Sequence, residues 1–382
     1  MNGDISAIRA EIDGIDDELS ALLQRRLDIM ASVAAFKRER GASVSDPARE
    51  RGILARIAGS ARPEYENALR VLFTTLFGIS KAKQRQLIGG EGELVARIRS
   101  AAAAGRLFPT RAVVACAGTE GSYAQEAVSR LFPIPTIIYF TGFEAVFEAV
   151  EKGLCPYGIL PIENSAAGSV SAVYDLMVRH RFHIARALRL KVNHVLLAPR
   201  GVRLEDVREV SSHPHALAQC SAFFKARPEI KATPATNTAV AAKTLAESGR
   251  RDMAVIASRA CAELYGLDVL AGDIADAPFN YTRFICISKD LEITPDAGKF
   301  SIMLSLPHRP GALSSIIAKF AAIGVNLTKL ESRPVPGLDF EFRFTFEFVA
   351  PPADPDVLSL LGELSRDPDI EHFTFLGAYA EK

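Results

Sequence analysis

The 382-residue sequence has no tryptophan, only five cysteines and no excess of charge of either sign. No two cysteines lie close enough to form a metal-binding clip, and they are scattered at Cys116, Cys155, Cys220, Cys261 and Cys286. Such scattered cysteines are typical of reduced thiols in a cytoplasmic protein. Lys plus Arg number 45, as do Asp plus Glu, so the bulk charge attracts neither nucleic acid nor membrane. Any cationic site therefore has to be local.

Long apolar runs are also missing. No run approaches the ~20 residues that a membrane-spanning helix needs. The polar, acidic start of the chain, Met1 to Asp4, is not followed by the apolar core of a signal peptide. We therefore expect a cytoplasmic protein with no membrane or nucleic-acid partner. Its length and its 48% apolar residues are sufficient for two or three domains, each with its own core.

Residues 1–88 have the pattern of an all-α domain. Apolar residues in the first part alternate at spacings of three and four, as in a long helix, at Ile5, Ile8, Ile12, Ile15, Leu19, Leu22, Ile29, Val33 and Phe36. Gly41 is expected to end this helix, Asp46 and Pro47 to begin a second, and residues 64–86 to form a third. The first helix would be ~60 Å long. Two short helices cannot cover it, so we expect a homodimer or homotetramer.

From residue 111 the pattern changes to short apolar runs that alternate with helical stretches. This predicts an α/β domain with a largely buried sheet over 111–289. Residues 89–110, which are rich in glycine at their start, are interpreted as a linker with a short helical stretch. Residues 299–378 have the order strand, helix, strand, strand, helix, strand, which predicts an α+β domain of the ferredoxin-like type.

Several cations lie on or beside the apolar seam of the first helix. Arg26 occupies a core position of the heptad, and Arg9 and Lys37 flank the same seam. A buried cation is costly unless an anion meets it. One interpretation is an interhelical salt bridge or a side chain that reaches solvent. The other is an anion site inside a helical bundle, which Ser80 and Gln84 favour because they lie one turn apart on an inward face.

Eight polar residues of this region match, in order and spacing, the active-site pattern of the all-helical chorismate mutases: Arg9, Arg26, Lys37, Asp46, Arg49, Glu50, Ser80 and Gln84. The resemblance covers most of residues 5–86. It implies that Arg26 binds one carboxylate of chorismate and that Arg9 of a partner subunit binds the other. It also implies that Lys37 and Gln84 face the ether oxygen and that Glu50 holds the ring hydroxyl.

These residue types suit that reaction. The rearrangement of chorismate to prephenate transfers no proton and forms no covalent intermediate, so the protein has only to hold a reactive conformer and stabilise developing charge. Arginine and lysine suit this work, because the two substrate carboxylates need cationic partners. Asp46 is explained equally well as a helix N-cap.

Four polar clusters lie at predicted strand and helix junctions in the middle domain: 118–123, 161–169, 212–217 and 280–284. Each one alone is explained by caps, turns or strand residues. Together they resemble the prephenate dehydratases over nearly all of 111–289, with Asn280 to Phe284 as the most specific motif. The resemblance implies a two-lobed α/β fold, similar to periplasmic binding proteins, with the active site in the cleft.

Thr282 is the residue to which this resemblance assigns hydrogen bonding or proton transfer to the leaving hydroxyl. Because a free hydroxyl is a poor acid, we expect Thr282 to position or relay a proton. Arg283 is the candidate carboxylate ligand, and the other expected substrate-binding residues are Ser122, Glu163, Asn164, Ser165, Ser212, Asn280 and Phe284. The reaction is driven by aromatisation and needs no metal or other cofactor. The chain departs from the family pattern at Thr119 and His215, and arogenate remains the alternative substrate.

Two segments of the last domain, Arg309 to Ser314 and Asn326 to Pro334, fit a tight turn and an edge strand. They also resemble the phenylalanine-binding signatures of ACT domains in prephenate dehydratases. The resemblance implies that phenylalanine binds there and inhibits the enzyme. The expected ligand-binding residues are Gly311, Ala312, Leu313, Ser314, Asn326, Leu327, Glu331, Ser332 and Arg333.

The combined prediction is a bifunctional chorismate mutase and prephenate dehydratase with an ACT regulatory domain, no cofactor, and phenylalanine as allosteric inhibitor. The competing hypothesis is a non-catalytic sensor, made of a two-lobed small-molecule binder with a helical dimerisation arm. The presence of Arg26 with Lys37, and of Thr282 with Arg283, argues for the enzyme.

Overall fold

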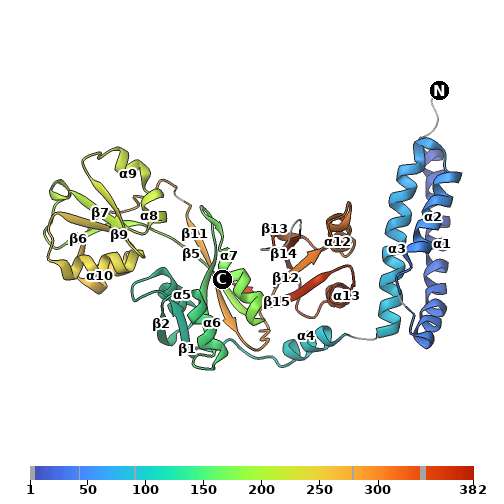
Figure 1. The fold of residues 1–382 in the computed structure, drawn as a ribbon, viewed down its shortest axis with the longest axis horizontal. Helices are drawn as coiled ribbons and strands as arrows, with labels where there is room; N and C mark the ends of the chain where they lie inside the picture. The colour runs from blue at the N-terminus through green and yellow to red at the C-terminus, as the bar shows by residue number, and fades with distance from the viewer. Residues whose placement is uncertain (1–4, 43, 90–91, 278, 336–340) are drawn as a thin grey trace.

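The computed structural model describes residues 5–42, 44–89, 92–277, 279–335 and 341–382 (Figure 1). Its N-terminal part is helical, with α1 (Ile5–Arg40), α2 (Pro47–Ser60), the 3₁₀ turn η1 (Pro63–Tyr65) and α3 (Glu66–Gly89). Asp46 accepts a hydrogen bond from the Arg49 amide at 3.0 Å and Pro47 occupies the first turn, so α2 begins where the sequence predicts.

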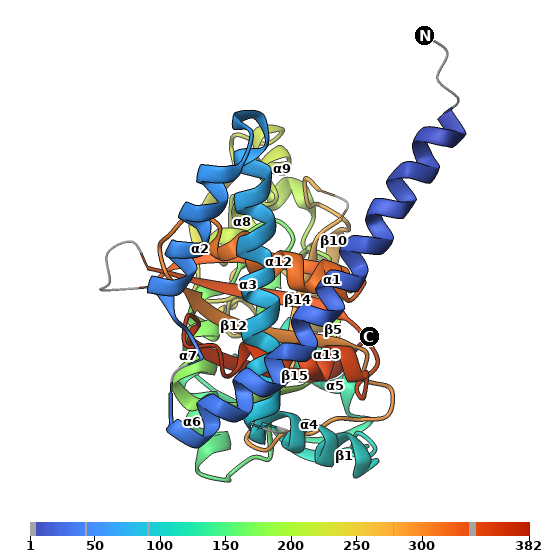
Figure 2. The ribbon, with the colours of Figure 1, turned by 90° about the vertical axis from the view of Figure 1, so that its right-hand side faces the viewer.

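The apolar seam of α1 lies open in the single chain. Eight of its side chains are between 48% and 62% exposed: Ile5, Ile8, Ile12, Ile15, Leu19, Leu22, Ile29 and Phe36. The N-terminal turns of α1 project beyond α2 and α3, as Figure 2 shows. The two shorter helices therefore leave most of this seam uncovered, and exposed apolar surface of this extent marks an interaction site.

The middle of the chain folds into two lobes. The first lobe has the strand order β5-β11-β3-β1-β2, with the short β4 (Gly168–Ser169) paired to β3. Its other strands are β1 (Arg111–Ala117), β2 (Ile134–Phe140), β3 (Tyr157–Asn164), β5 (His183–Lys191) and β11 (Tyr281–Ser288). Helices pack on its faces: α5 (Tyr123–Leu131), α6 (Phe143–Glu151) and α7 (Ser171–His180).

The second lobe has its own sheet, in the order β10-β6-β9-β7-β8. Its strands are β6 (Val195–Pro199), β7 (Glu209–Ser212), β8 (Lys231–Pro234), β9 (Met253–Ala257) and β10 (Leu267–Ala271). Its helical segments are η2 (Leu204–Asp206), α8 (Pro214–Ala218), α9 (Ser221–Lys225), α10 (Thr238–Ser248) and α11 (Ala260–Tyr265). The chain enters this lobe after β5 and returns to the first lobe in β11. Because β5 and β11 are paired strands, the two chain segments that join the lobes lie side by side.

The C-terminal part has the element order that the sequence predicts. It runs β12 (Lys299–Leu306), α12 (Ala312–Ala322), β13 (Leu327–Pro334), β14 (Phe342–Val349), α13 (Pro355–Leu364) and β15 (Glu371–Glu381). The strands are antiparallel in the order β13-β14-β12-β15, which is the ferredoxin-like arrangement. The end of β15 pairs with β5, Ala380 with Arg186, so this sheet is continuous with that of the first lobe.

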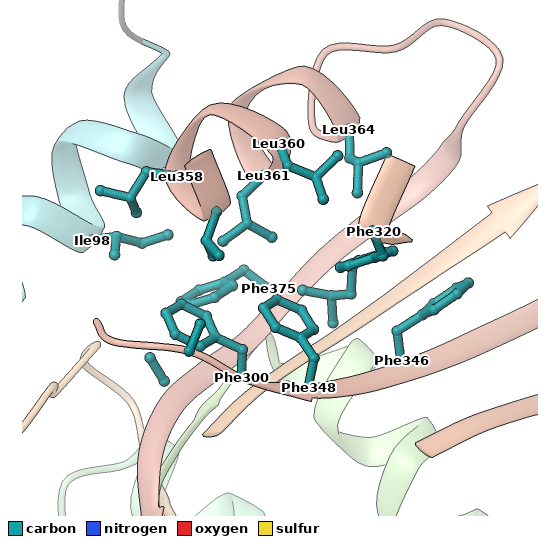
Figure 3. Packing of buried hydrophobic residues seen from close by; sticks show 14 of the residues in the cluster. Ile98, Phe300, Phe320, Phe346, Phe348, Leu358, Leu360, Leu361, Leu364 and Phe375 are labelled. Carbon is teal, nitrogen blue, oxygen red and sulfur yellow. The ribbon is translucent and has the colours of Figure 1, made fainter. Parts of the chain in front are cut away.

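The predicted linker is partly an element of the C-terminal core. It contains α4 (Glu93–Ala103), whose Val95 and Ile98 are buried against α13. Figure 3 shows Ile98 beside Leu358 and Leu361, in the same apolar cluster as the phenylalanines of the sheet. The segment between the helical part and the two lobes is therefore anchored on the C-terminal domain. Within the described part of the chain, no helix has both the length and the apolar character to cross a membrane.

Candidate functional site

The first polar cluster lies between α1 and α3. Arg26 donates hydrogen bonds from Nη1 to Ser80 Oγ and, at 3.3 Å, to the carbonyl of Leu76. Burial lowers the pKa of Arg26. Among the described residues no carboxylate forms an ion pair with this guanidinium, so the salt-bridge interpretation of Arg26 is not supported. A half-buried guanidinium without an anion is suited to bind one.

Gln84 extends this cluster by one turn of α3. Its side chain is buried, with Nε2 at 3.4 Å from Met30 Sδ, while Oε1 has no hydrogen-bond partner in the described structure. A buried amide that lacks a partner is costly unless a ligand or water satisfies it. Arg26, Ser80 and Gln84 therefore form one inward-facing polar surface, as the sequence predicts.

The remaining expected mutase residues form other contacts or are exposed. Glu50 pairs with Lys81 at 3.2 Å across α2 and α3, and Lys37 donates to the carbonyl of Val44 at 2.7 Å. Asp46 acts as the α2 N-cap and Arg49 is exposed. Arg9 is also exposed, in the second turn of α1, and among the described residues no hydrogen bond or ion pair joins it to this cluster. No sequence pattern singles out Lys81, because its partner Glu50 lies 31 residues away.

The second site is a cleft of about 550 Å³ that residues of both lobes line. The first lobe and β11 contribute Ala117, Gly118, Ser122, Tyr123, Ala124, Phe143, Pro161, Asn164, Ala167, Gly168, Ser169, Val170, Thr282 and Phe284. The segment between β5 and β6 and the second lobe contribute Val192, His194, His213, His215, Ala216, Gln219, Asn237 and Thr238. None of these lining residues is a lysine or an arginine.

A hydrogen-bonded network joins the polar residues of the cleft. Asn164 Nδ2 donates to Thr282 Oγ1 at 2.9 Å and to Asn280 Oδ1 at 3.0 Å. Asn280 Nδ2 donates to Gln219 Oε1 at 2.9 Å, and the His194 Nε2 to Gln219 Oε1 distance is also 2.9 Å. The network thus runs from β3 and β11 into the second lobe. It fixes the Thr282 hydroxyl in the wall of the cleft.

The cleft offers neutral hydrogen-bonding groups. Ser122 caps α5 and accepts from the Gln125 amide at 3.4 Å. Burial lowers the pKa of His194, and burial together with His215 lowers the pKa of His213. These imidazoles are therefore neutral near pH 7. The rings of His213 and His215 stack at 5.3 Å.

Two serines that the sequence predicts to bind substrate form structural hydrogen bonds instead. Ser212 is fully buried and donates to the carbonyl of Ile256 at 2.6 Å, because its position on β7 directs it into the second lobe. Ser165 accepts from the Tyr281 amide at 3.0 Å and donates to the carbonyl of Phe279, so it fastens β3 to the start of β11. Neither residue lines the cleft, which corrects the expectation for both.

Arg283 and Glu163 also differ from the expectation. They pair with each other across the register of β11 and β3, directly after the Thr282 and Asn164 pair. Since successive side chains of a strand point to opposite faces, Arg283 and Glu163 face away from the cleft. Arg283 binds Glu347 of β14 through both Nη atoms, and its Nη1 lies 3.3 Å from Glu163. Arg283 is therefore not placed to bind a substrate carboxylate.

The expected phenylalanine-binding segments lie at one edge of the C-terminal domain. Gly311 is the N-cap of α12 with φ +82°, a conformation that favours glycine, and Ala312, Leu313 and Ser314 form the first turn. Asn326 and Leu327 lead into β13, where Glu331 and Arg333 pair with each other at 2.9 Å. Ser332 points to the opposite face of β13 from these two charges.

Sequence reasoning missed several residues at these sites. His194, Gln219 and Asn237 line the cleft and belong to no motif that the sequence made evident. Lys329 and Glu347 lie directly behind the cleft wall, and only the pairing of distant strands brings them there. In the part of the chain that is described, no group of three His, Cys, Asp or Glu side chains is arranged to hold a metal ion.

Comparison with known proteins places both sites in recognised domains. Residues 114–292 match the family model "Prephenate dehydratase", and residues 8–85 match "Chorismate mutase type II". The chain is 40% identical over 265 residues to "Arogenate dehydratase/prephenate dehydratase 1, chloroplastic" of Arabidopsis thaliana, which covers 65% of this chain and 67% of that protein.

Solved structures share the fold of the larger part of the chain. A prephenate dehydratase from Arthrobacter aurescens in complex with L-Phe is 33% identical, with a TM-score of 0.63 over 70% of this chain and 89% of that chain. A protein described as a quorum quenching acylase, GqqA, is 28% identical, with a TM-score of 0.62 over 71% of this chain and 98% of that chain. The expected two-lobed fold of the middle domain is thus confirmed.

Proposed function

Because the chain belongs to the prephenate dehydratase family and carries a type II chorismate mutase domain ahead of the dehydratase domain, we propose that it catalyses two consecutive steps of phenylalanine biosynthesis. The first converts chorismate to prephenate and the second converts prephenate to phenylpyruvate. The observation that carries the proposal is the hydrogen bond from Asn164 to Thr282 in a cleft between two lobes.

In the mutase step the residues bind and orient the substrate. Arg26 binds one carboxylate, and Ser80 and Gln84 line the same inward surface. The unpartnered Gln84 Oε1 marks a place where a ligand group is needed. Glu50 with Lys81 holds the polar ring substituents, and Lys37 supplies a further cation from the last turn of α1. Positioning and electrostatic stabilisation suffice, since the rearrangement transfers no proton.

The mutase site is completed by a second copy of the chain. Arg9 is remote from Arg26 within one chain, and the exposed seam of α1 gives a second α1 a surface of matching character. A two-fold pairing along this seam would bring Arg9 of one subunit towards the cluster of the other. We propose a homodimer on this basis.

In the dehydratase step prephenate loses carbon dioxide and its ring hydroxyl. The Thr282 hydroxyl hydrogen-bonds the leaving hydroxyl and relays a proton from solvent to it, so that the group leaves as water and the Thr282 hydroxyl is restored. The carbon–carbon bond to the ring carboxylate breaks, and its electron pair completes the aromatic ring. A cleft wall without lysine or arginine suits this step, because no fixed cation stabilises the carboxylate before it leaves.

Arogenate is the second candidate substrate, since the Arabidopsis thaliana relative carries both substrate names. The two differ at the side chain, where arogenate has an ammonium and prephenate a keto group. The described cleft lining offers no carboxylate to pair with that ammonium, which favours prephenate. The experiment is to supply each compound separately and measure phenylpyruvate and phenylalanine. Equal or greater turnover of arogenate would reverse the preference.

Phenylalanine is the proposed inhibitor, bound at an ACT domain formed by residues 299–378. The Arthrobacter aurescens relative was solved with L-Phe. In this chain the first amides of α12, after the glycine at 311, can donate to a carboxylate, and Asn326 can accept from the ammonium. Inhibition would couple this site to the cleft by a free energy of typically 1–3 kcal/mol.

A further inference from the structure

The C-terminal domain touches the wall of the dehydratase cleft at Ser169. This residue lines the cleft from β4. Its Oγ donates to Glu331 Oε2 at 2.6 Å and accepts from Lys329 Nζ at 2.8 Å. Both partners lie on β13, about 160 residues further along the chain. The orientation of a cleft hydroxyl thus depends on two charged residues of another domain.

Lys329 makes a second contact close to the reactive residues. Its Nζ lies 3.0 Å from Glu163 Oε2 and 3.1 Å from Glu331 Oε2, and its side chain is only 13% exposed. The ammonium also lies over the ring of Tyr174, 5.5 Å from the centroid. Glu163 immediately precedes Asn164, so Lys329 holds the strand end that carries the Asn164 amide.

Glu347 holds the neighbouring strand in the same way. It binds both Nη atoms of Arg283, which immediately follows Thr282, and it also lies 3.3 Å from Lys299. The Arg283 and Glu347 side chains are 6% and 2% exposed. Burial opposes the charge of Glu347, but Arg283 and Lys299 outweigh it and lower its pKa. Removing one member of such a buried pair leaves the other uncompensated.

We propose that Lys329 and Glu347 of the C-terminal sheet are positioning residues of the dehydratase site. Glu347 acts through Arg283 on Thr282, and Lys329 acts through Glu163 on Asn164 and directly on Ser169. The two strands meet at the hydrogen bond from Asn164 to Thr282, so each contact fixes one end of that bond. This inference rests on the dehydratase function proposed above.

The side chains of β13 point alternately to the two faces of the sheet, and this gives the contact a regulatory consequence. Lys329, Glu331 and Arg333 face the dehydratase domain, while the residues between them, Leu330 and Ser332, face the other way. The segment with the expected phenylalanine-binding residues therefore also carries the side chains that hold the cleft wall. A ligand that shifts β13 would change the Ser169 contact without approaching the cleft.

The test compares the steady-state kinetics of Lys329→Met and Glu347→Gln with those of the parent. Methionine keeps the length of the side chain over Tyr174 and removes the ammonium. We expect dehydratase kcat to fall roughly 10- to 100-fold with KM changed less than about threefold, as for a misplaced catalytic group. The mutase rate of the same preparation should stay at the parent value. Lys329→Arg, which keeps a cation, should recover most of the turnover.

Lys319→Met is the matched control. Lys319 pairs with Glu363 and Asp367 inside the C-terminal domain and does not reach the dehydratase strands. It should leave both activities at the parent level. A parent without dehydratase activity would overturn the proposed function. An active parent whose Lys329→Met variant keeps the parent kcat, or shows a raised KM alone, would overturn the positioning role while leaving that function intact.

Discussion

Asn164 and Thr282 lie opposite each other in the antiparallel register of β3 and β11, and the Asn164 amide donates to the Thr282 hydroxyl at 2.9 Å. The Asn164 Oδ1 accepts from the amides of Ala166 and Ala167 at 3.0 Å each, which fixes the amide as the donor. The proton of the Thr282 hydroxyl is therefore not used in this bond. It remains available to a leaving group in the cleft.

Thr282→Val tests this role, because valine keeps the branched shape in a strand and removes the hydroxyl. We expect dehydratase kcat to fall by about 10²–10⁴, the range for a positioned proton-transfer group. The mutase rate should be unchanged. Thr282→Ser, which keeps the oxygen, is the control and should retain far more activity. Parent-like formation of phenylpyruvate by the valine variant would remove Thr282 from the mechanism.

Arg26→Ala should lower the mutase activity and leave the dehydratase activity intact, the reverse of the change at Thr282. The change removes a guanidinium that no carboxylate neutralises within the described chain, so substrate binding should suffer more than the fold. Mutase kcat/KM should fall at least 10²-fold, as for loss of a charged partner of the substrate, while the dehydratase rate stays near that of the parent. The exposed neighbour Arg25 provides the control, since Arg25→Ala should leave both rates unchanged. Retention of mutase activity with lowered helical stability would instead indicate a structural role for Arg26.

Gly311→Val tests the proposed phenylalanine site. The backbone has φ +82° there, so a branched residue distorts the turn that starts α12, although no atom would clash with its Cβ. We expect inhibition by phenylalanine to be lost and basal dehydratase turnover to be retained. Gly249→Val, at φ +67° with equally open surroundings in the second lobe, controls for backbone strain. A variant at 311 inhibited as strongly as the parent would contradict the assignment.

The buried imidazole of His194 predicts an acid-sensitive dehydratase domain. Burial lowers its pKa, so the folded protein binds fewer protons here than the unfolded chain does. Its contribution to stability is therefore complete above the ordinary imidazole pKa of about 6.5 and is lost as the pH falls below it. Between pH 7 and pH 5 the midpoint of thermal unfolding should fall less for His194→Asn than for the parent. Equal slopes would show that His194 titrates normally.

Local patterns were sufficient to predict much of the fold. The three- and four-residue spacing of α1, the Asp46 and Pro47 start of α2 and the element order of the C-terminal domain follow from interactions between residues close in sequence. The packing of α4 on α13 could not be predicted in this way. Val95 and Ile98 reveal an apolar face, but their partners lie more than 250 residues away.

The site residues also divide into those that local sequence patterns predict and those that they do not. Thr282 and Asn164 were expected in one cleft and are found there, because both belong to motifs at strand ends. Arg283 and Glu163 belong to the same motifs, yet a shift of one residue along a strand reverses the face. The residues that contact this other face, above all Glu347, are brought there by strand pairing between separate domains, which local patterns do not reveal.

Conversion of chorismate by the purified full-length chain, with no other enzyme added, tests the central proposal most directly. Chorismate, prephenate and phenylpyruvate are measured over time, with arogenate supplied in a parallel reaction. We predict that chorismate is consumed, that prephenate appears transiently, and that phenylpyruvate accumulates and its formation slows when phenylalanine is added. Chorismate that remains unchanged, or prephenate that accumulates without conversion to phenylpyruvate, would contradict the bifunctional assignment.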